Sequence, residues 1–412
     1  MKQILKWSAA WFTFLARGLF RAVRGLWELL GPGPGWSGLG RWLLQIATLG
    51  VLAGAGGFLF AAAGLAPIKA SSGHWPITAW FLNFSMSRSV STHTLGMNVP
   101  ALNDHGLVLK GAAHYETGCF PCHGSPELPH PRIARAMTPH PPYLPPAIHE
   151  WEPEELFYIV KHGVKFTGMP AWPTQQRDDE VWAIVAFLQK FPELNVQEYR
   201  KLVRGAAVVS KDDAPIHGLT GPDAVPRAVT NNCQRCHGID GQGGGSGAFP
   251  KLAGQQPAYL EASLEAYARG RRHSGMMEPI AAGLSREEMR EIARFYGGLT
   301  AAPPTVIPPR SDMAVNRGAT IARQGVQRQR IPICVDCHGP GESQPNPVYP
   351  TLAGQYADYL VLQLELFKQE HRGGSEFAHL MHPVASQLTP AQMRDVARYY
   401  ESLPASTVPS GR

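Results

Sequence analysis

Cysteine is scarce in this chain of 412 residues: there are six, and none lies outside three short motifs. A zinc site built from Cys-x-x-Cys needs a second ligand pair, but each pair here stands about 100 residues from the next. A thioredoxin-like redox pair needs a βαβ setting, which the sequence does not show around any pair. Disulfide bonds would leave unexplained the histidine that follows each pair. The common roles of paired cysteines are therefore disfavoured.

Sequence signatures of catalysis are also missing. No Ser-His-Asp constellation, pair of acidic residues or independent metal motif stands above background. The glycine-rich run at 241–247 has the composition of a phosphate-binding loop, but it follows a cysteine motif instead of a strand, so we interpret it as a flexible loop. We therefore expect no catalytic residues in this chain, and we do not interpret it as an enzyme by itself.

Excess positive charge is absent beyond the first 41 residues. The formal net charge is +6, of which residues 1–41 hold +5 and the other 371 residues only +1. A basic isoelectric point that comes from one terminal stretch is no evidence for a nucleic-acid surface. We therefore predict no nucleic-acid partner.

What the chain does contain is one pentapeptide pattern, Cys-x-x-Cys-His, three times, at 119–123, 233–237 and 334–338. Two thiols three residues apart can add to the two vinyl groups of one porphyrin, and the adjacent imidazole then meets the iron. We therefore predict three covalently bound haem c groups. The attachment residues would be Cys119, Cys122, Cys233, Cys236, Cys334 and Cys337, and the proximal iron ligands His123, His237 and His338.

A methionine follows each motif at a similar distance. Met169, Met277 and Met381 lie 46, 40 and 43 residues after their histidines, and we predict them as the sixth iron ligands. A thioether ligand favours Fe(II), raises the reduction potential and blocks other ligands, which suits electron transfer. Two alternatives stay open, namely Met276 in place of Met277, and His379 or His382 in place of Met381.

Charged residues are absent from Trp42 to Ile68, and this run is long enough to span a bilayer. We predict an uncleaved single-pass anchor; a cleaved signal peptide is the alternative, since small residues occur at 61–63 and at 66. The positive charge before the run favours a bacterial inner-membrane protein with its N-terminus in the cytoplasm and its haem domains in the periplasm. Residues 1–41 would form a basic amphipathic helix on the membrane lipid, or a poorly ordered leader.

The chain repeats itself after residue 230. Residues 249–255 (Phe-Pro-Lys-Leu-Ala-Gly-Gln) return at 349–355 (Tyr-Pro-Thr-Leu-Ala-Gly-Gln), and Met-Glu-Pro-Ile from 277 returns as Met-His-Pro-Val from 381. Capping boxes that start a closing helix are predicted at Ser285 with Glu288, and at Thr389 with Gln392. The aromatic residues of these helices, Tyr296 and Tyr400 among them, are expected to be core. Two homologous helical domains therefore stand in tandem.

Residues 220–403 resemble the tandem dihaem class I cytochromes c of the c-four type. The resemblance rests on Cys-x-x-Cys-His-Gly, on Pro-x-Leu-Ala-Gly-Gln, on Tyr-Leu and on a methionine seven residues before the Leu-Ser or Leu-Thr pair at which each closing helix starts. Residues 101–195 resemble a generic monohaem class I cytochrome c domain. The resemblance implies an all-α fold with helices wrapped round each haem, and His/Met iron ligation. It also implies that the carbonyl groups of Pro250 and Pro350, and more weakly Pro142, orient the proximal imidazoles.

The predicted architecture is all-α, with three cytochrome c domains in series behind one N-terminal transmembrane helix. Domains of about 100 residues bury little surface, so haem would form much of each core. The predicted parts are a cytoplasmic leader (1–41), a transmembrane anchor (42–68), a juxtamembrane segment (69–100), domain 1 (101–195), a linker (196–219), domain 2 (220–300), a Pro-rich linker (301–312), domain 3 (313–403) and a tail (404–412).

These features predict a membrane-anchored triheme cytochrome that relays single electrons in a respiratory chain. The expected partners are a quinol-oxidising complex as donor and a haem-copper terminal oxidase as acceptor. The alternative is the cytochrome subunit of a periplasmic alcohol, aldehyde or sugar-acid dehydrogenase complex. Such triheme subunits resemble a pattern with threonine after the motif histidine and a C-terminal anchor, whereas Gly124, Gly238 and Gly339 follow the histidines here. A peroxidase would need an open iron site, and the three methionines argue against it.

Overall fold

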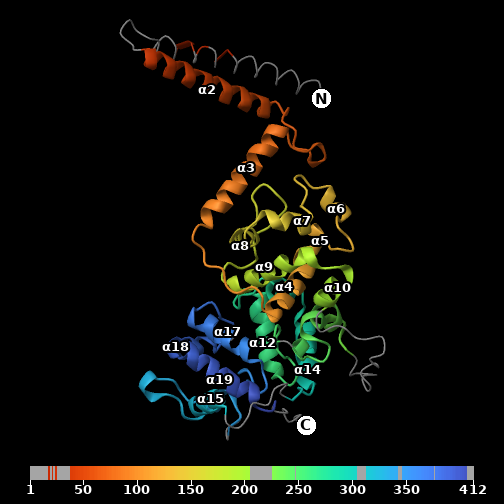
Figure 1. The fold of residues 1–412 in the computed structure, drawn as a ribbon, viewed down its shortest axis with the longest axis vertical. Helices are drawn as coiled ribbons and strands as arrows, with labels where there is room; N and C mark the ends of the chain where they lie inside the picture. The colour runs from red at the N-terminus through yellow and green to blue at the C-terminus, as the bar shows by residue number, and fades with distance from the viewer. Residues whose placement is uncertain are drawn as a thin grey trace. The chain divides into compact units, whose positions relative to one another are not determined.

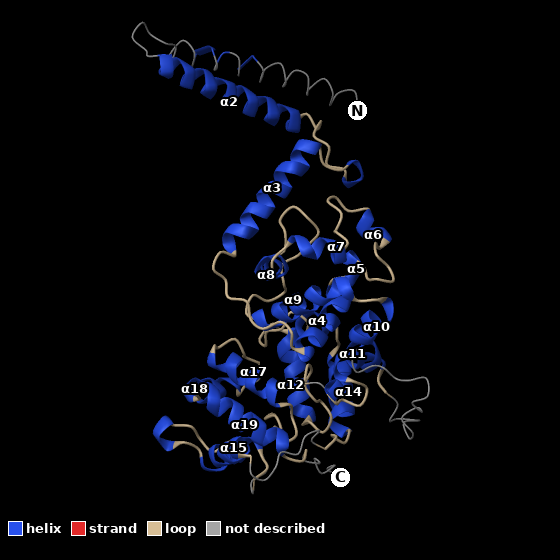
Figure 2. Ribbon diagram, viewed as in Figure 1, coloured by secondary structure: helices blue, strands red, loops and turns tan. Residues whose placement is uncertain are grey.

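The computed structural model describes residues 17–18, 21, 24–25, 38–204, 225–245, 247–303, 312–341, 346–374 and 376–405. Within these ranges the regular structure is helical and there is no strand; Val326 and Ile331 form one isolated bridge (Figure 2). The prediction of an all-α fold is confirmed for this part of the chain. The predicted leader helix lies almost entirely outside the described residues, as do most of both linkers and of the tail.

The chain divides into two units, residues 1–72 and 73–412. The first unit contains α2 (Gly38–Ala62) and a 3-10 turn, Ala70–Ser72. Helix α2 has 25 residues with large apolar side chains exposed along it, and its length and composition are sufficient for a membrane span. It ends six residues before the predicted boundary at Ile68, because Gly64 has a left-handed φ of 71° and Pro67 follows.

Helix α3 (Pro76–His93) occupies much of the stretch expected as a juxtamembrane segment. Proline is tolerated in its first turn, where the amide hydrogen has no partner inside the helix. Near its C-terminal end α3 is tied to α8 (Pro153–His162): the Ser91 hydroxyl donates to Glu155 at 2.7 Å, and His93 stacks on Tyr158. This contact attaches α3 to the helical region that follows it.

Segment 1 comprises residues 101–204. Its helices are α4 (His105–Gly118), α5 (Phe120–His123), α6 (Arg132–Arg135), α7 (Leu144–Ala147), α8, α9 (Asp178–Lys190) and α10 (Val196–Arg204), with 3-10 turns at Ile148–Glu150 and Phe191–Glu193. Asp104 caps α4 by accepting a hydrogen bond from the Leu107 amide at 2.7 Å. Helices α4 and α9 cross with their backbones in contact, since a Cβ on Gly111 would lie 1.9 Å from the carbonyl oxygen of Ala183. Only glycine permits this crossing.

Segment 2 (225–303) and segment 3 (312–405) complete the second unit. Segment 2 contains a π-helical turn (Val229–Cys233), α11 (Gln234–His237), a 3-10 turn (Gly243–Gly245), α12 (Pro257–Ala268), α13 (Met277–Ala282) and α14 (Arg286–Gly298). Segment 3 contains α15 (Met313–Gln324), a 3-10 turn (Gln327–Gln329), α16 (Val335–His338), α17 (Ala357–Lys368), a 3-10 turn (Ala378–Leu380), α18 (Met381–Gln387) and α19 (Pro390–Ser402). Both predicted capping boxes, at the starts of α14 and α19, are confirmed.

Each segment has a buried apolar cluster of its own, and the segments follow one another along the chain (Figure 1). Tyr115 and Phe187 lie at the centre of the first cluster, Tyr296 in the second and Tyr400 in the third, all four with no exposed surface. The closing helix of segment 3 repeats the crossing seen in segment 1, because a Cβ on Gly318 would lie 2.0 Å from the carbonyl oxygen of Asp395. Segments 1 and 3 therefore share a crossing of opening and closing helices, whereas segment 2 begins with the π-helical turn that leads into its motif.

Candidate haem-binding sites

Each Cys-x-x-Cys-His motif forms one helical turn that ends at the histidine: α5, α11 and α16. In the first motif the amide of His123 bonds the carbonyl group of Cys119 at 2.9 Å, and in the third His338 bonds Cys334 at 3.0 Å. Residues three and four apart share one face of a helical turn. The two thiols and the imidazole of a motif are therefore presented together. The glycine after each histidine has a positive φ, between 62° and 76°, which turns the chain away.

The six cysteines are free, and no two of them form a disulfide bond. Burial raises the pKa of Cys119 and Cys233 to about 12 and that of Cys236 and Cys334 to about 11. A raised pKa indicates apolar surroundings, because these disfavour the thiolate. Such surroundings suit the attachment points of a largely apolar porphyrin.

Each motif histidine is oriented by a proline carbonyl group. The Nδ1 atom of His123 lies 3.0 Å from the Pro142 oxygen, that of His237 lies 3.2 Å from Pro250, and that of His338 lies 2.9 Å from Pro350. All three contacts were expected, the first of them only weakly. A carbonyl oxygen accepts, so Nδ1 carries the proton and Nε2 is left with its lone pair for a metal. Burial lowers the pKa of all three rings, which favours the neutral form that ligates.

In segments 1 and 2 a buried tyrosine lies behind the motif: Tyr115 comes from α4, before its motif, and Tyr296 from the closing helix α14. The sequence predicted Tyr296 only as a core residue, and Tyr115 was not predicted at all. The Tyr115 hydroxyl donates to the Gly124 carbonyl group at 2.8 Å, and the Tyr296 hydroxyl donates to Gly238 at 2.9 Å. The buried hydroxyl of Tyr400 has no partner within the described part of the chain. The alignment of Tyr296 with Tyr400 in the repeat was the signal that could have indicated a shared position.

The predicted methionine ligands occupy loops and helix starts after each motif. Met277 is the first residue of α13 and packs on the core of segment 2, and Met381 is the first residue of α18 and packs near Phe367. Met169 is half-buried in a turn, where its amide donates to the Thr167 hydroxyl at 3.1 Å. The equivalent places of Met277 and Met381 are consistent with one shared role, and the ligand roles remain predictions.

The rival ligands have other contacts. Met276 packs on the core of segment 1, so it faces a different segment from Met277. The Nε2 atom of His382 lies 2.8 Å from the Arg372 carbonyl oxygen, and His379 is exposed with its Nδ1 atom 2.9 Å from the Glu376 carbonyl oxygen. These contacts favour Met277 and Met381 over their neighbours.

Two buried arginines lie at the boundary of segments 2 and 3, at equivalent positions of the repeat. Arg272 donates to Ser263 at 3.0 Å and to Tyr359 at 3.1 Å, and Arg372 donates to Tyr259 at 3.0 Å. Burial disfavours ionisation of Tyr259, but the two guanidinium groups outweigh it and lower its pKa to about 7.

The Nε atom of Arg372 has no hydrogen-bond partner among the described residues, and no described ion pair includes either arginine. A buried cation without an anion is strongly unfavourable, so this place fits negatively charged groups such as haem propionates. Together with the thiols and oriented imidazoles, it makes the second unit a fit for covalently bound haem.

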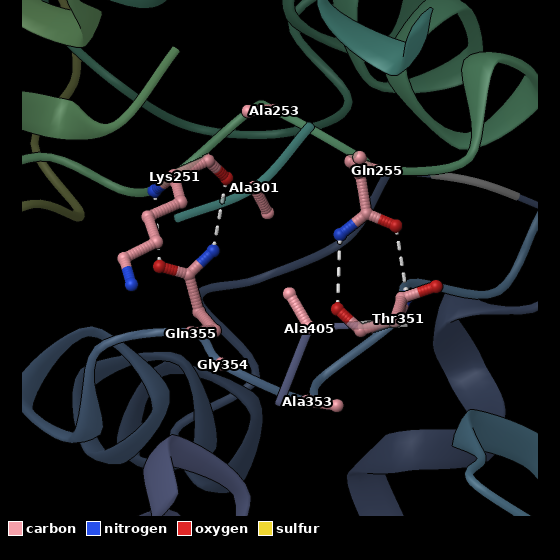
Figure 3. A pocket seen from close by; sticks show the side chains of 10 residues that line it. Lys251, Ala253, Gln255, Ala301, Thr351, Ala353, Gly354, Gln355 and Ala405 are labelled. Carbon is pink, nitrogen blue, oxygen red and sulfur yellow. Dashed lines mark hydrogen bonds between the residues drawn. The ribbon is translucent and has the colours of Figure 1, made fainter. Parts of the chain in front are cut away.

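The Pro-x-Leu-Ala-Gly-Gln motifs form the contact between segments 2 and 3 (Figure 3). Gln355 accepts from the Lys251 amide and donates to the Lys251 carbonyl group, both at 3.0 Å. Gln255 makes the reciprocal pair with Thr351, at 2.8 Å and 3.0 Å. Lys251 and Thr351 directly follow the prolines that orient His237 and His338, so the segment contact and the two histidine sites share one stretch of backbone.

Two family models match the chain. Residues 106–188 match the model described as cytochrome c oxidase, cbb3-type, subunit III, and residues 224–298 and 316–404 match the model described as cytochrome c. The chain is 34% identical to a thiosulfate dehydrogenase electron acceptor of Thiomonas intermedia, over 45% of this chain and 84% of that protein. It is 36% identical to a protein of the same description from Stutzerimonas stutzeri, over 44% of this chain and 82% of that one. A cytochrome c4 of Thiocapsa roseopersicina is 29% identical over 44% of this chain and 92% of its own length.

Proposed function

Because the chain belongs to the class I c-type cytochromes, we propose that it relays single electrons through three haem domains in series, at a membrane to which α2 anchors it. The observation that carries the proposal is the threefold recurrence of a Cys-x-x-Cys-His turn whose histidine is oriented by a proline carbonyl group. The haem domains would be residues 101–195, 220–300 and 313–403, with the linkers at 196–219 and 301–312.

The chain's own residues would hold each haem and limit its chemistry. Haem c, when bound, supplies an iron that gains and loses one electron. The two thiols of a motif would fix the porphyrin, and the neutral histidine would donate its Nε2 lone pair. Met169, Met277 and Met381 would fill the sixth position, which excludes oxygen and peroxide and leaves electron transfer as the reaction.

The match of residues 106–188 to a cbb3-type oxidase subunit supports electron flow toward a haem-copper terminal oxidase, with a quinol-oxidising complex as donor. The exposed apolar helix α2 supports placement at the bacterial inner membrane, with the haem domains in the periplasm. The relatives described as thiosulfate dehydrogenase electron acceptors support a second candidate. In that candidate the chain accepts electrons from a periplasmic dehydrogenase instead of from quinol.

Haem content and membrane attachment test the first part of the proposal. The full chain should remain in the membrane fraction after a high-salt wash, and a pyridine haemochrome assay should give three haems per chain. A value of two haems per chain would contradict the proposal of three haem domains. Release of the chain by salt would contradict the proposed membrane anchor.

Electron flow in respiring membranes separates the two candidates. If the chain passes electrons to a terminal oxidase, we expect added quinol to reduce the haems and air to reoxidise them in a step that cyanide blocks. With the second candidate, purified thiosulfate dehydrogenase and thiosulfate should reduce the haems while quinol does not. Reduction by neither donor would contradict both candidates.

A further inference from the structure

A buried carboxylate of segment 1 holds the loop of segment 2 that leads to Met277. Glu180, the third residue of α9, is 3% exposed. It accepts a hydrogen bond from the Ser274 hydroxyl at 2.6 Å and another from the Gly275 amide at 2.7 Å. Ser274 and Gly275 stand three and two residues before Met277. The backbone next to the predicted ligand is thus fixed by a residue that lies 94 positions earlier.

Trp172 joins the same contact from the methionine loop of segment 1. It stands three residues after Met169, and its indole Nε1 donates to Glu180 at 3.2 Å. Its ring lies directly on Gly275, where an added Cβ would be 2.2 Å from the ring atoms. The loops that carry Met169 and Met277 therefore meet at one indole ring.

Further contacts extend this junction. The Arg177 guanidinium lies 3.1 Å from Glu180 and donates to the His273 carbonyl group at 2.8 Å. Met276 packs on the core of segment 1. A buried carboxylate that accepts from several fixed donors has one well-defined position, because each lost hydrogen bond would leave a buried polar atom unpaired.

A second patch of segment 1 lies against the motif of segment 2. Leu109 and Ala113 of α4 pack with Phe249, and Cys236 lies against the same cluster. Segment 1 therefore touches segment 2 both beside a predicted haem-attachment cysteine and beside the loop of its predicted methionine ligand.

We propose that Glu180 and Trp172 are positioning residues for the second haem site: segment 1 holds the 273–277 loop in the conformation in which Met277 reaches the iron. The inference rests on the proposed His/Met ligation. It also joins the first two haem sites at their methionine loops. The equivalent loop of segment 3 lies instead against Arg271 and Arg272 of segment 2, so the third site should not depend on Glu180.

The test uses the full haem-loaded chain with Glu180→Gln, which removes acceptor capacity at nearly constant volume. Asp178→Asn is the matched control, since Asp178 lies on the same helix with a half-exposed side chain paired to Lys161. We expect E180Q to lose about one third of the sulfur-to-iron absorption near ~695 nm, and to lower one of three midpoint potentials. D178N should leave the band and all three potentials unchanged.

Trp172→Phe is the second variant, because it keeps an aromatic side chain at this position but removes the indole hydrogen bond to Glu180 and the indole edge that lies on Gly275. We expect W172F to shift the same single midpoint potential by a smaller amount. If E180Q does not fold, W172F serves as the test in its place. Folded variants with an unchanged band and unchanged potentials would overturn the inference. So would an equal change at all three haems, which would indicate general loosening. A wild-type haem count below three, or a wild-type chain without the band, would instead contradict the proposed function.

Discussion

Gln255 and Gln355 each bind the backbone of the other's segment, in two reciprocal pairs of hydrogen bonds around Thr351 and Lys251. Both amides are buried, with 7% and 6% of their surface exposed. The pairing explains why glutamine ends both copies of the repeated motif. It also means that the segment contact and the orientation of His237 and His338 depend on neighbouring residues of one stretch of backbone.

We expect Gln355→Ala to lower the free energy of unfolding by about 1–3 kcal/mol, because it leaves the buried amide and carbonyl groups of Lys251 unpaired. Chemical denaturation followed by haem absorption measures the change. Gln197→Ala, at an exposed position of α10, is the control and should have little effect. A stability equal to that of the wild type would show that water replaces the lost contacts.

Met277→Ala and Met276→Ala should affect different properties, the first an iron ligand and the second the packing of the core. Met277 packs on the core of segment 2, and its loss should open one iron, with a weaker band near ~695 nm and a lower potential. Met276 packs on segment 1, so its loss should leave a cavity and reduce stability without removing an iron ligand. Absorption spectra and denaturation of both variants measure this. If only M276A lost the band, the ligand would be Met276.

Tyrosine-to-phenylalanine changes should reveal the hydrogen bonds behind the motifs. Tyr115→Phe and Tyr296→Phe each leave a glycine carbonyl group without its partner, and we expect about 0.5–1.5 kcal/mol of destabilisation. Tyr400→Phe removes a hydroxyl that has no described partner, and should be neutral or slightly stabilising. Equal losses in all three variants, measured by denaturation, would contradict this difference.

His114 should make the protein acid-sensitive. Burial, followed by repulsion from Lys110, lowers the pKa of His114 from 6.5 to about 3. The unfolded chain binds a proton below pH 6.5 that the folded chain takes up only near pH 3, so stability falls as pH drops through this window. The expected loss is on the order of a few kcal/mol at the acid end.

Replacing His114 with leucine should therefore flatten the dependence of the denaturation midpoint on pH between 6.5 and 3. Asp179 and Arg177 lie in the same surroundings and are left in place by the substitution. An unchanged slope in the variant would assign the acid sensitivity to the nearby carboxylates.

Local patterns predicted the local features of this protein. The capping boxes at Ser285 and Thr389 need only residues three apart, and both are present. The histidine-to-proline contacts were expected only from the family resemblance, and each of them spans fewer than 20 residues. Helix α3 was not predicted, since its exposed aromatic residues give no one-sided apolar pattern.

The contact of Glu180 with Ser274 could not be predicted from the sequence. It joins residues 94 positions apart in segments that do not repeat each other, and a glutamate at a helix start is usually exposed. The unpaired Nε atom of Arg372 could not be predicted either, because the sequence does not show that this side chain is buried and donates to the Tyr259 hydroxyl instead of to a carboxylate.

The crossing of Gly111 and Ala183 also orders events during synthesis. Helix α4 begins segment 1 and α9 comes late in it, before α10, so this crossing cannot form until α9 has been synthesised. The thiols of Cys119 and Cys122 emerge about 60 residues earlier, a delay of several seconds at ordinary translation rates. During that interval both sulfur atoms lie on a chain in which this crossing has not formed, and Cys119 packs on the complete core of segment 1 only after α9 has arrived.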